Sequence, residues 1–150
     1  MELWGDPRVT RYLGGPFTPD QVRDKLASEI DTQRAHGFQY WPFFLLGDDR
    51  HVGCAGLRPY KGQDVAHELG FHLRPEYWGM GLAFEAATAV IRYAFNILGV
   101  DALFAGHIPE HDASRVVLIK LGFVYSGMEV YPRSGILEPT YLLRKSPVST

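Results

Sequence analysis

The chain has 150 residues, of which 46% are hydrophobic and 21% charged, and its formal net charge is −2. These values predict one folded domain over residues 1–150 with a full hydrophobic core, and they exclude extensive disorder. A charge this close to zero argues against general nucleic-acid binding, which needs a basic face. No run approaches the roughly 18 apolar residues of a membrane span, and the N-terminus shows no signal-peptide pattern, so we expect no membrane partner.

The N-terminal part of the chain predicts two helices. Asp6-Pro7 begins a short helix, which the run Gly14-Gly15-Pro16 ends. Thr18 is a helix cap with a proline at the first helical position, and the helix should continue to about His36 and stop at Gly37. We expect its inward face to consist of Val22, Leu26, Ile30 and Gln33.

Three antiparallel strands should follow. The runs Tyr40–Leu46 and Val52–Leu57 are apolar and β-prone, and the turn Gly47–Arg50 between them predicts a hairpin. Ala66–Leu73 is the third strand, and Arg74-Pro75 ends it because proline cannot continue a central strand. An alanine-rich segment with helical apolar periodicity then runs from Leu82 to about Leu98.

The last third of the chain predicts a strand, a short helix and two further strands. The first strand is Ala102–Ile108, and Asp112 or His111 caps a helix of about ten residues. Its apolar face should be Val116, Val117 and Leu121, and Gly122 should end it. The final strands lie near Val124–Tyr131 and Glu138–Arg144, linked through residues 132–135. The whole order indicates an α/β domain with a mixed, mostly antiparallel sheet.

Neither the single cysteine nor the histidines indicate a chemical centre. Cys54 lies between two small residues in an apolar strand, which indicates a buried residue rather than a nucleophile. One cysteine cannot form an intramolecular disulfide, which fits a reducing compartment, and we expect a cytoplasmic protein. His67 and His72 face opposite sides of their strand and no metal-binding motif exists, so we expect no metal.

A glycine-containing turn joins the third strand to the long helix and carries Gly79 and Gly81. A strand followed by a glycine turn and the start of a helix brings free backbone N–H groups together with the positive end of a helix dipole. Such a place can bind phosphate. The turn fits neither the P-loop nor the dinucleotide fingerprint, because no Lys-Ser or Lys-Thr follows Gly81 and Asp101 opens the next strand instead of ending one.

Two segments resemble motifs of the GNAT N-acetyltransferases. Residues 78–83, Trp-Gly-Met-Gly-Leu-Ala, are similar to the acyl-CoA loop Q/R-x-x-G-x-G/A, with Trp78 in the Gln/Arg place. Residues 111–123 resemble N-x-x-S-x-x-L/V-x-x-K-x-G-F, with Ser114, Lys120, Gly122 and Phe123 in place and His111 at the asparagine. The sequence from Pro75 onward resembles that of the branch that includes the ribosomal-protein N-terminal alanine acetyltransferases.

The resemblance implies the GNAT fold. In that fold the strand before the glycine loop and the strand before the Ser114 helix run parallel and splay apart at one end, where the pantetheine arm of the cofactor enters. Family members usually begin with a further strand, for which Met1–Trp4 leaves no room, so either the start is late or the sheet lacks its first strand. Trp4, Val9 and Tyr12 are too little apolar material to cover that edge, and an exposed edge invites pairing, so we expect a homodimer.

The resemblance also implies roles for two catalytic residues. Glu68 stands where many members carry the glutamate that deprotonates the acceptor amine, and by strand alternation it shares a face with Gly70 and His72. The alternative is a strand-end carboxylate in solvent or in a structural hydrogen bond. Ser114 stands where the family places a donor to the leaving thiolate, and its alternative is a cap on the first turn of its helix.

The expected acyl-CoA contacts come from the third strand, the glycine loop and the Ser114 helix. His111 could replace the hydrogen bonds of the usual asparagine. The full set of expected cofactor-binding residues is Phe71, His72, Leu73, Trp78, Gly79, Met80, Gly81, Leu82, Ala83, His111, Ser114 and Lys120.

The resemblance thus predicts a transferase that moves an acyl group, most simply acetyl from acetyl-CoA, to a primary amine by direct attack in a ternary complex. The amine would belong to a protein N-terminus or to a small molecule. The alternative from another class is a non-catalytic acyl-CoA-binding regulatory module on the same fold.

Overall fold

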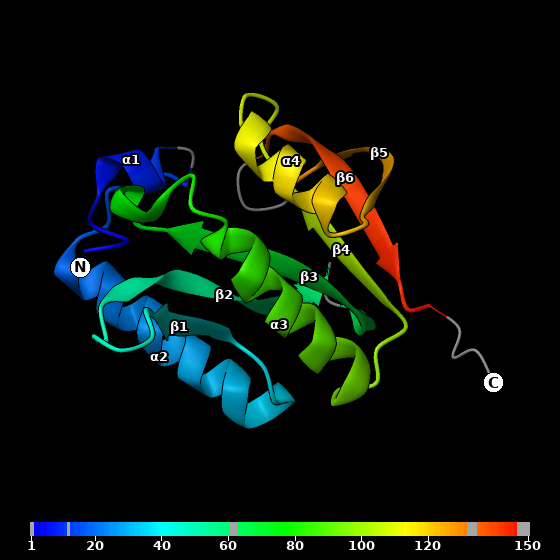
Figure 1. The fold of residues 1–150 in the computed structure, drawn as a ribbon, viewed down its shortest axis with the longest axis horizontal. Coiled ribbons are helices and arrows are strands. Elements are labelled where there is room, and N and C mark those ends of the chain that lie inside the picture. Colours follow the sequence, from blue (N-terminus) through cyan, green and yellow to red (C-terminus); the bar gives the residue numbers. More distant parts are fainter. Residues whose placement is uncertain (1, 12, 61–62, 132–134, 147–150) are drawn as a thin grey trace.

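A mixed β-sheet forms the centre of the molecule (Figure 1). The structure, a computed structural model, describes residues 2–11, 13–60, 63–131 and 135–146, with the side chains of residues 63–66 left out. Within this part the sheet order is β1-β2-β3-β4-β6-β5. The strands are β1 (Tyr40–Phe44), β2 (His51–Tyr60), β3 (Gln63–Leu73), β4 (Ala102–Gly106), β5 (Val124–Val130) and β6 (Leu137–Arg144).

The helices of the described residues are α1 (Pro7–Thr10), α2 (Pro19–His36), α3 (Leu82–Asn96), α4 (Asp112–Lys120) and the 3₁₀ turn η1 (Pro75–Tyr77). The order of the helices and strands confirms the sequence-based elements, and their bounds agree with the predicted ones to within about three residues. Tyr12 and the link at residues 132–134 lie outside the described part. None of these helices is long and apolar enough to cross a membrane.

The strand directions confirm a mixed, mostly antiparallel sheet. β1 pairs antiparallel with β2, and β2 with β3. β3 and β4 are parallel, whereas β4–β6 and β5–β6 are antiparallel. β1 and β5 are the two edges of the sheet in the described chain, so no strand precedes β1 there.

The parallel pair separates soon after it forms. β3 and β4 are in register at only two positions, His67 with Leu103 and Glu68 with Phe104, although β3 continues to Leu73 and β4 to Gly106. The carboxyl ends of the two strands therefore do not pair with each other. This confirms the splayed pair that the resemblance implied.

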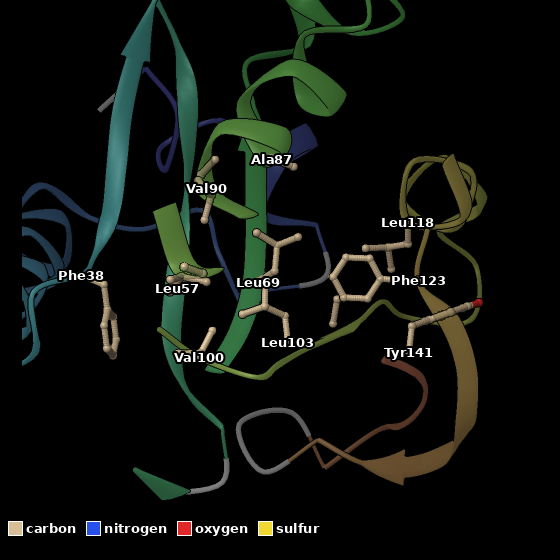
Figure 2. Close-up of a cluster of buried hydrophobic side chains, with 13 residues drawn as sticks. Phe38, Leu57, Leu69, Ala87, Val90, Val100, Leu103, Leu118, Phe123 and Tyr141 are labelled. Atoms are coloured by element: carbon tan, nitrogen blue, oxygen red, sulfur yellow. The ribbon is translucent and has the colours of Figure 1, made fainter. Parts of the chain in front are cut away.

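The main core lies on the face of the sheet that α3 and α4 cover (Figure 2). Leu57, Leu69 and Leu103 point from β2, β3 and β4 toward Ala87 and Val90 of α3. On the far side of the separated strands, Leu118 of α4 meets Phe123 and Tyr141. One continuous apolar layer thus holds both halves of the sheet together.

A smaller apolar cluster covers part of the opposite face. Leu3 is buried against Tyr40 and Cys54, and the ring of Trp4 meets the edge of the His72 ring at 4.9 Å between centroids. The N-terminal segment is therefore packed on its own sheet, and Leu3 contributes apolar surface that the sequence analysis did not count.

Helix α2 begins and ends as predicted, but the residues that it turns inward differ from the predicted ones. Thr18 and Gln21 form a capping box at its start, and Gly37 ends it with a φ of 80°. No residue of α2 is fully buried. Leu26 is 59% and Ile30 39% exposed, so the expected inward face is wrong for these two residues, whereas Val22 and Gln33 are half-buried. The reason is position: α2 lies along β1 (Figure 1) and is tied there by polar side chains, described below.

Helix α4 shows a smaller correction. Val116 was expected to face inward but is 49% exposed, and Leu118 is the buried residue. The sheet-facing stripe follows helical spacing through Ser114, Val117, Leu118 and Leu121, so Ser114 shares the inner side. Gly122 ends the helix as predicted, with a φ of 96° and its N–H bonded to the Ile119 carbonyl.

Candidate active site

The glycine loop after β3 is open and lacks a side-chain cap. Gly79 and Gly81 have φ values of 74° and 77°, in the region that favours glycine, and an added Cβ at either would meet nothing within 4 Å. Gly81 is the N-cap of α3 and no side chain bonds to the first N–H groups of that helix. These N–H groups form a place where an anion can lie.

Trp78, which stands in the Gln/Arg place of the motif, ties this loop to the end of β3. Its indole N–H donates to the Leu73 carbonyl at 2.9 Å, while about half of the ring remains exposed. Trp78 brings no positive charge, so any attraction of the loop for phosphate comes from backbone dipoles. Met80 beside it is also exposed.

Near the point where β3 separates from β4, most side chains of β3 already pack against other residues of the protein. Phe71 packs against the main core and Leu73 is buried. His72 lies in the smaller cluster, where burial lowers its pKa to about 3, so the ring is neutral at ordinary pH. These three residues would therefore meet a cofactor through their main chain.

The start of α4 carries a paired serine and histidine. Ser114 Oγ makes a short hydrogen bond with His111 Nδ1, and His111 is the N-cap residue without a side-chain bond to the backbone. Burial, followed by the nearby His107, lowers the pKa of His111. The two candidate residues are thus brought together, and Lys120 lies in the last turn of the same helix.

Glu68 lines a cavity of about 360 Å³ on the face opposite α3. Ser28, Glu29 and Thr32 of α2 form one side, while the sheet supplies the rest, from Arg58 on β2 to Thr140 on β6. Glu68 belongs to the last residue pair before β3 and β4 separate. Its predicted face is confirmed, because the β2–β3 register sets it opposite Arg58 and sets Gly70 and His72 opposite Gly56 and Cys54.

The cavity also contains residues that the sequence analysis missed: Arg58, Tyr60, Glu129 and Glu138. Arg58 pairs with Glu29 at 3.4 Å, and the Tyr60 hydroxyl donates a short hydrogen bond to Glu129. One signal in the sequence points to Glu138, which is a carboxylate in the last strand that alternates with apolar residues. Ser114 and His111 do not line the cavity, so Glu68 and Ser114 lie in different places around the separated strands.

Among the described residues no group of three or more His, Cys, Asp or Glu side chains could hold a metal ion. Cys54 is buried, and burial raises the pKa of its thiol to about 12. A thiol that stays protonated is a poor nucleophile. Cys54 is therefore a poor candidate for an acyl-enzyme intermediate.

Comparison with known proteins assigns this arrangement to a family. A family model described as an acetyltransferase (GNAT) domain matches residues 1–124, so the chain belongs to the GNAT acetyltransferases. It is accordingly an N-acetyltransferase that uses acetyl-CoA.

Individual relatives agree. The chain is 29% identical over 129 residues to the uncharacterized N-acetyltransferase p20 of Bacillus licheniformis, covering 85% of this chain and 72% of that one. It is 34% identical over 89 residues to the [ribosomal protein uS5]-alanine N-acetyltransferase of Escherichia coli, covering 59% and 46%. A solved GNAT-family acetyltransferase from Bacillus anthracis superposes with a TM-score of 0.81 at 26% identity, covering 95% and 85%.

Proposed function

We propose that the protein transfers the acetyl group of acetyl-CoA directly to a primary amine, within a ternary complex. The observation that carries this proposal is the separation of β3 from β4 beyond Glu68, with the glycine loop after β3 and the Glu68 cavity on the opposite face. A thioester held between the strands would be within reach of an amine in the cavity. Donor and acceptor would thus approach the same carbon from two sides.

Acyl-CoA binding would use backbone groups before side chains. The pyrophosphate would bind the N–H groups from Gly79 to Ala83, supported by the dipole of α3. The pantetheine would lie along the main chain of Phe71–Leu73. Trp78, Met80 and Leu82 would flank the loop, and His111 and Lys120 would contact the cofactor from α4.

In the reaction Glu68 would take a proton from the acceptor ammonium, because only the neutral amine can attack. The amine nitrogen would form its bond to the carbonyl carbon and lose its second proton to solvent, and the carbon–sulfur bond would break as the sulfur leaves as a thiolate that takes up one proton. Ser114, held by His111, would donate to the departing thiolate. The products are an N-acetyl amine and CoA.

The acceptor would be a protein N-terminus or a small amine. Its test is a turnover screen in which released thiol is measured with acetyl-CoA and three acceptor sets: N-terminal peptides, polyamines and aminoglycosides. We expect thiol release that depends on one set. Tight CoA binding without acceptor-dependent release in any set would instead favour the non-catalytic acyl-CoA-binding module.

We further propose that residues 1–150 act as one acyltransferase domain in the cytoplasm. The buried, protonated state of Cys54 is compatible with a reducing compartment. Fractionation of cells that express the native chain, followed by immunodetection, tests the location.

We also propose a homodimer formed at the surface around β1. Its support is the edge position of β1 and the exposure of Leu26, Phe44 and Leu46 nearby. Pairing through the backbone alone is a poorer option there. The Tyr40 N–H already donates to Glu29 Oε2 at 2.8 Å, and Pro42 has no N–H.

A further inference from the structure

The cavity beside Glu68 is strongly acidic for its size. Among the residues that the structure describes, four glutamates line the cavity and Arg58 is the one lining cation. Arg58 is committed to Glu29, with side chains 15% and 14% exposed. Glu68, Glu129 and Glu138 also line the cavity, and Glu129 accepts a hydrogen bond from the Tyr60 hydroxyl. Glu129 and Glu138 stand opposite each other in the β5–β6 register.

Of these three glutamates, Glu138 gives the strongest indication of a cationic ligand. Its residue is only 9% exposed, yet its side chain has no hydrogen bond or ion pair within the part of the chain that the structure describes. Its Oε2 lies 3.6 Å from where a Cβ of Gly106 would be, and so borders space that the glycine leaves open. Burial, and then the charge of Glu68, raise the pKa of Glu138. A partly desolvated carboxylate that has no partner among the described residues is costly, and a bound cation would reduce that cost.

The remaining lining suits a short alkyl chain. The Tyr60 ring stacks on Phe104 with centroids 4.0 Å apart and planes at 2°, and its hydroxyl is held by Glu129. Tyr60 thus adds an aromatic ring to the cavity lining beside Glu129. Gly106, which has no side chain, also lines the cavity.

We infer, on the basis of the proposed function, that the acceptor is a small amine with a second cationic group, which Glu138 binds while Glu68 receives the reacting amine. The second ammonium would pair with a carboxylate that has no partner in the described part of the chain. A monoamine with the same carbon chain would leave Glu138 as it is. Glu138 is therefore the residue that determines acceptor specificity.

The test compares 1,4-diaminobutane with 1-aminobutane, which differ in one ammonium group. Calorimetry on the CoA-saturated protein should give a Kd at least about tenfold lower for the diamine. The ratio of kcat/KM with acetyl-CoA should favour the diamine in the same direction. In Glu138→Gln both ratios should fall to within about threefold, whereas Asp101→Asn, which removes an exposed carboxylate outside the cavity, should keep them.

The outcomes separate this inference from the proposed function. Equal binding and equal acetylation of the two amines would overturn the inference and leave the acetyltransferase proposal intact. Glu138-dependent diamine binding without acetylation would support the inference and count against amine transfer. Failure of both amines to bind, or preference for an alanine N-terminal peptide without a second cationic group, would also overturn the inference.

The thermal midpoint of Glu138→Gln gives an independent control. Because the variant removes a partly buried charge that has no partner among the described residues, its melting temperature without ligand should equal or exceed that of the wild type. A large decrease would show that Glu138 supports the fold rather than a ligand, and would overturn its role in specificity.

Discussion

At the scale of single residues, the glycine loop can be tested by one side chain. Gly81→Val adds bulk at the N-cap of α3 and disfavours its φ of 77°, so CoA affinity should fall by more than about tenfold. Calorimetry with CoA measures the change. Gly99→Val is the matched control, since Gly99 has a φ of 70° and open space around its Cα but lies after α3.

A folded Gly81→Val protein that binds CoA as the wild type does would contradict the pyrophosphate placement. A loss of the same size in Gly99→Val would instead show that backbone strain, rather than the loop, sets the affinity.

Variants of Glu68 and Ser114 should have different kinetic effects, because the two residues act on different protons. Glu68→Gln should lower kcat/KM by about 10²–10⁴-fold, with the largest loss at low pH and partial recovery as the amine deprotonates in solution. Ser114→Ala should slow thiol release while CoA affinity stays close to wild type. The measurement is the pH profile of kcat/KM between pH 6 and 9, and unchanged turnover in both variants would remove both assignments.

His72 should make the fold sensitive to acid. Its pKa is about 3 in the folded protein because of burial, against roughly 6.5 in the unfolded chain. The unfolded state therefore takes up a proton first, and the contribution of neutral His72 to stability is lost as pH falls from about 6.5 toward 3. Urea unfolding at pH 7 and pH 4.5 should show a smaller loss for His72→Gln than for wild type.

The exposed His36 provides the control for this experiment. His36→Gln should lose as much stability as wild type between the two pH values. Identical losses in all three proteins would show that carboxylates alone cause the acid sensitivity.

At the scale of elements, α4 offers a comparison inside one helix. Leu118→Ala removes a side chain that is 1% exposed and should cost about 2–5 kcal/mol of unfolding free energy. Val116→Ala changes an exposed neighbour and should stay within about 0.5 kcal/mol. Chemical denaturation measures both, and equal costs would contradict the orientation of α4.

The sequence allowed the elements and the strand directions to be predicted, because they depend on local signals. Thr18, Gly37 and Gly122 mark helix ends through caps that act within a few residues. The inward faces of α2 and α4 could not be predicted in the same way. Leu26 is exposed because α2 lies along a sheet edge, and that position is set by contacts with distant residues.

The same distinction between local signals and distant contacts applies to the candidate site. Glu68 and Ser114 belong to local sequence motifs, and strand alternation predicted the correct face for Glu68. Glu138 lies 70 residues away from Glu68 in the sequence. It joins Glu68 only because β6 is added beside β4, so no local pattern connects the two.

At the scale of the whole molecule, the homodimer is tested by light scattering. At tens of micromolar protein we expect twice the mass of the 150-residue chain. Leu26→Lys would place a charge on the exposed side of α2 and should shift the equilibrium toward monomer. A stable protein that remains strictly monomeric would contradict the dimer.

The attachment of α2 has a consequence for motion. Glu29 Oε2 accepts from the Tyr40 N–H and Glu29 Oε1 pairs with Arg58, while α2 itself buries no residue. Together with Gln33, whose Oε1 accepts from the Trp41 indole N–H at 3.1 Å, this carboxylate supplies much of the hold on an 18-residue helix. A helix held in this way can detach while the core stays folded, because detachment uncovers little apolar surface.

The acceptor cavity then has one side that can open on its own. In hydrogen exchange, the amides of α2 should exchange from a partly open state long before those of α3. Glu29→Gln should speed them by about tenfold or more, since bonds to a charged group are each worth about 1.5–3 kcal/mol. Asp20→Asn, at an exposed ion pair of the same helix, should change little. Entry of the acceptor would then be governed by the lifetime of this open state, and the rigid layer beneath α3 and α4 would keep the thioester in place while the amine comes and goes.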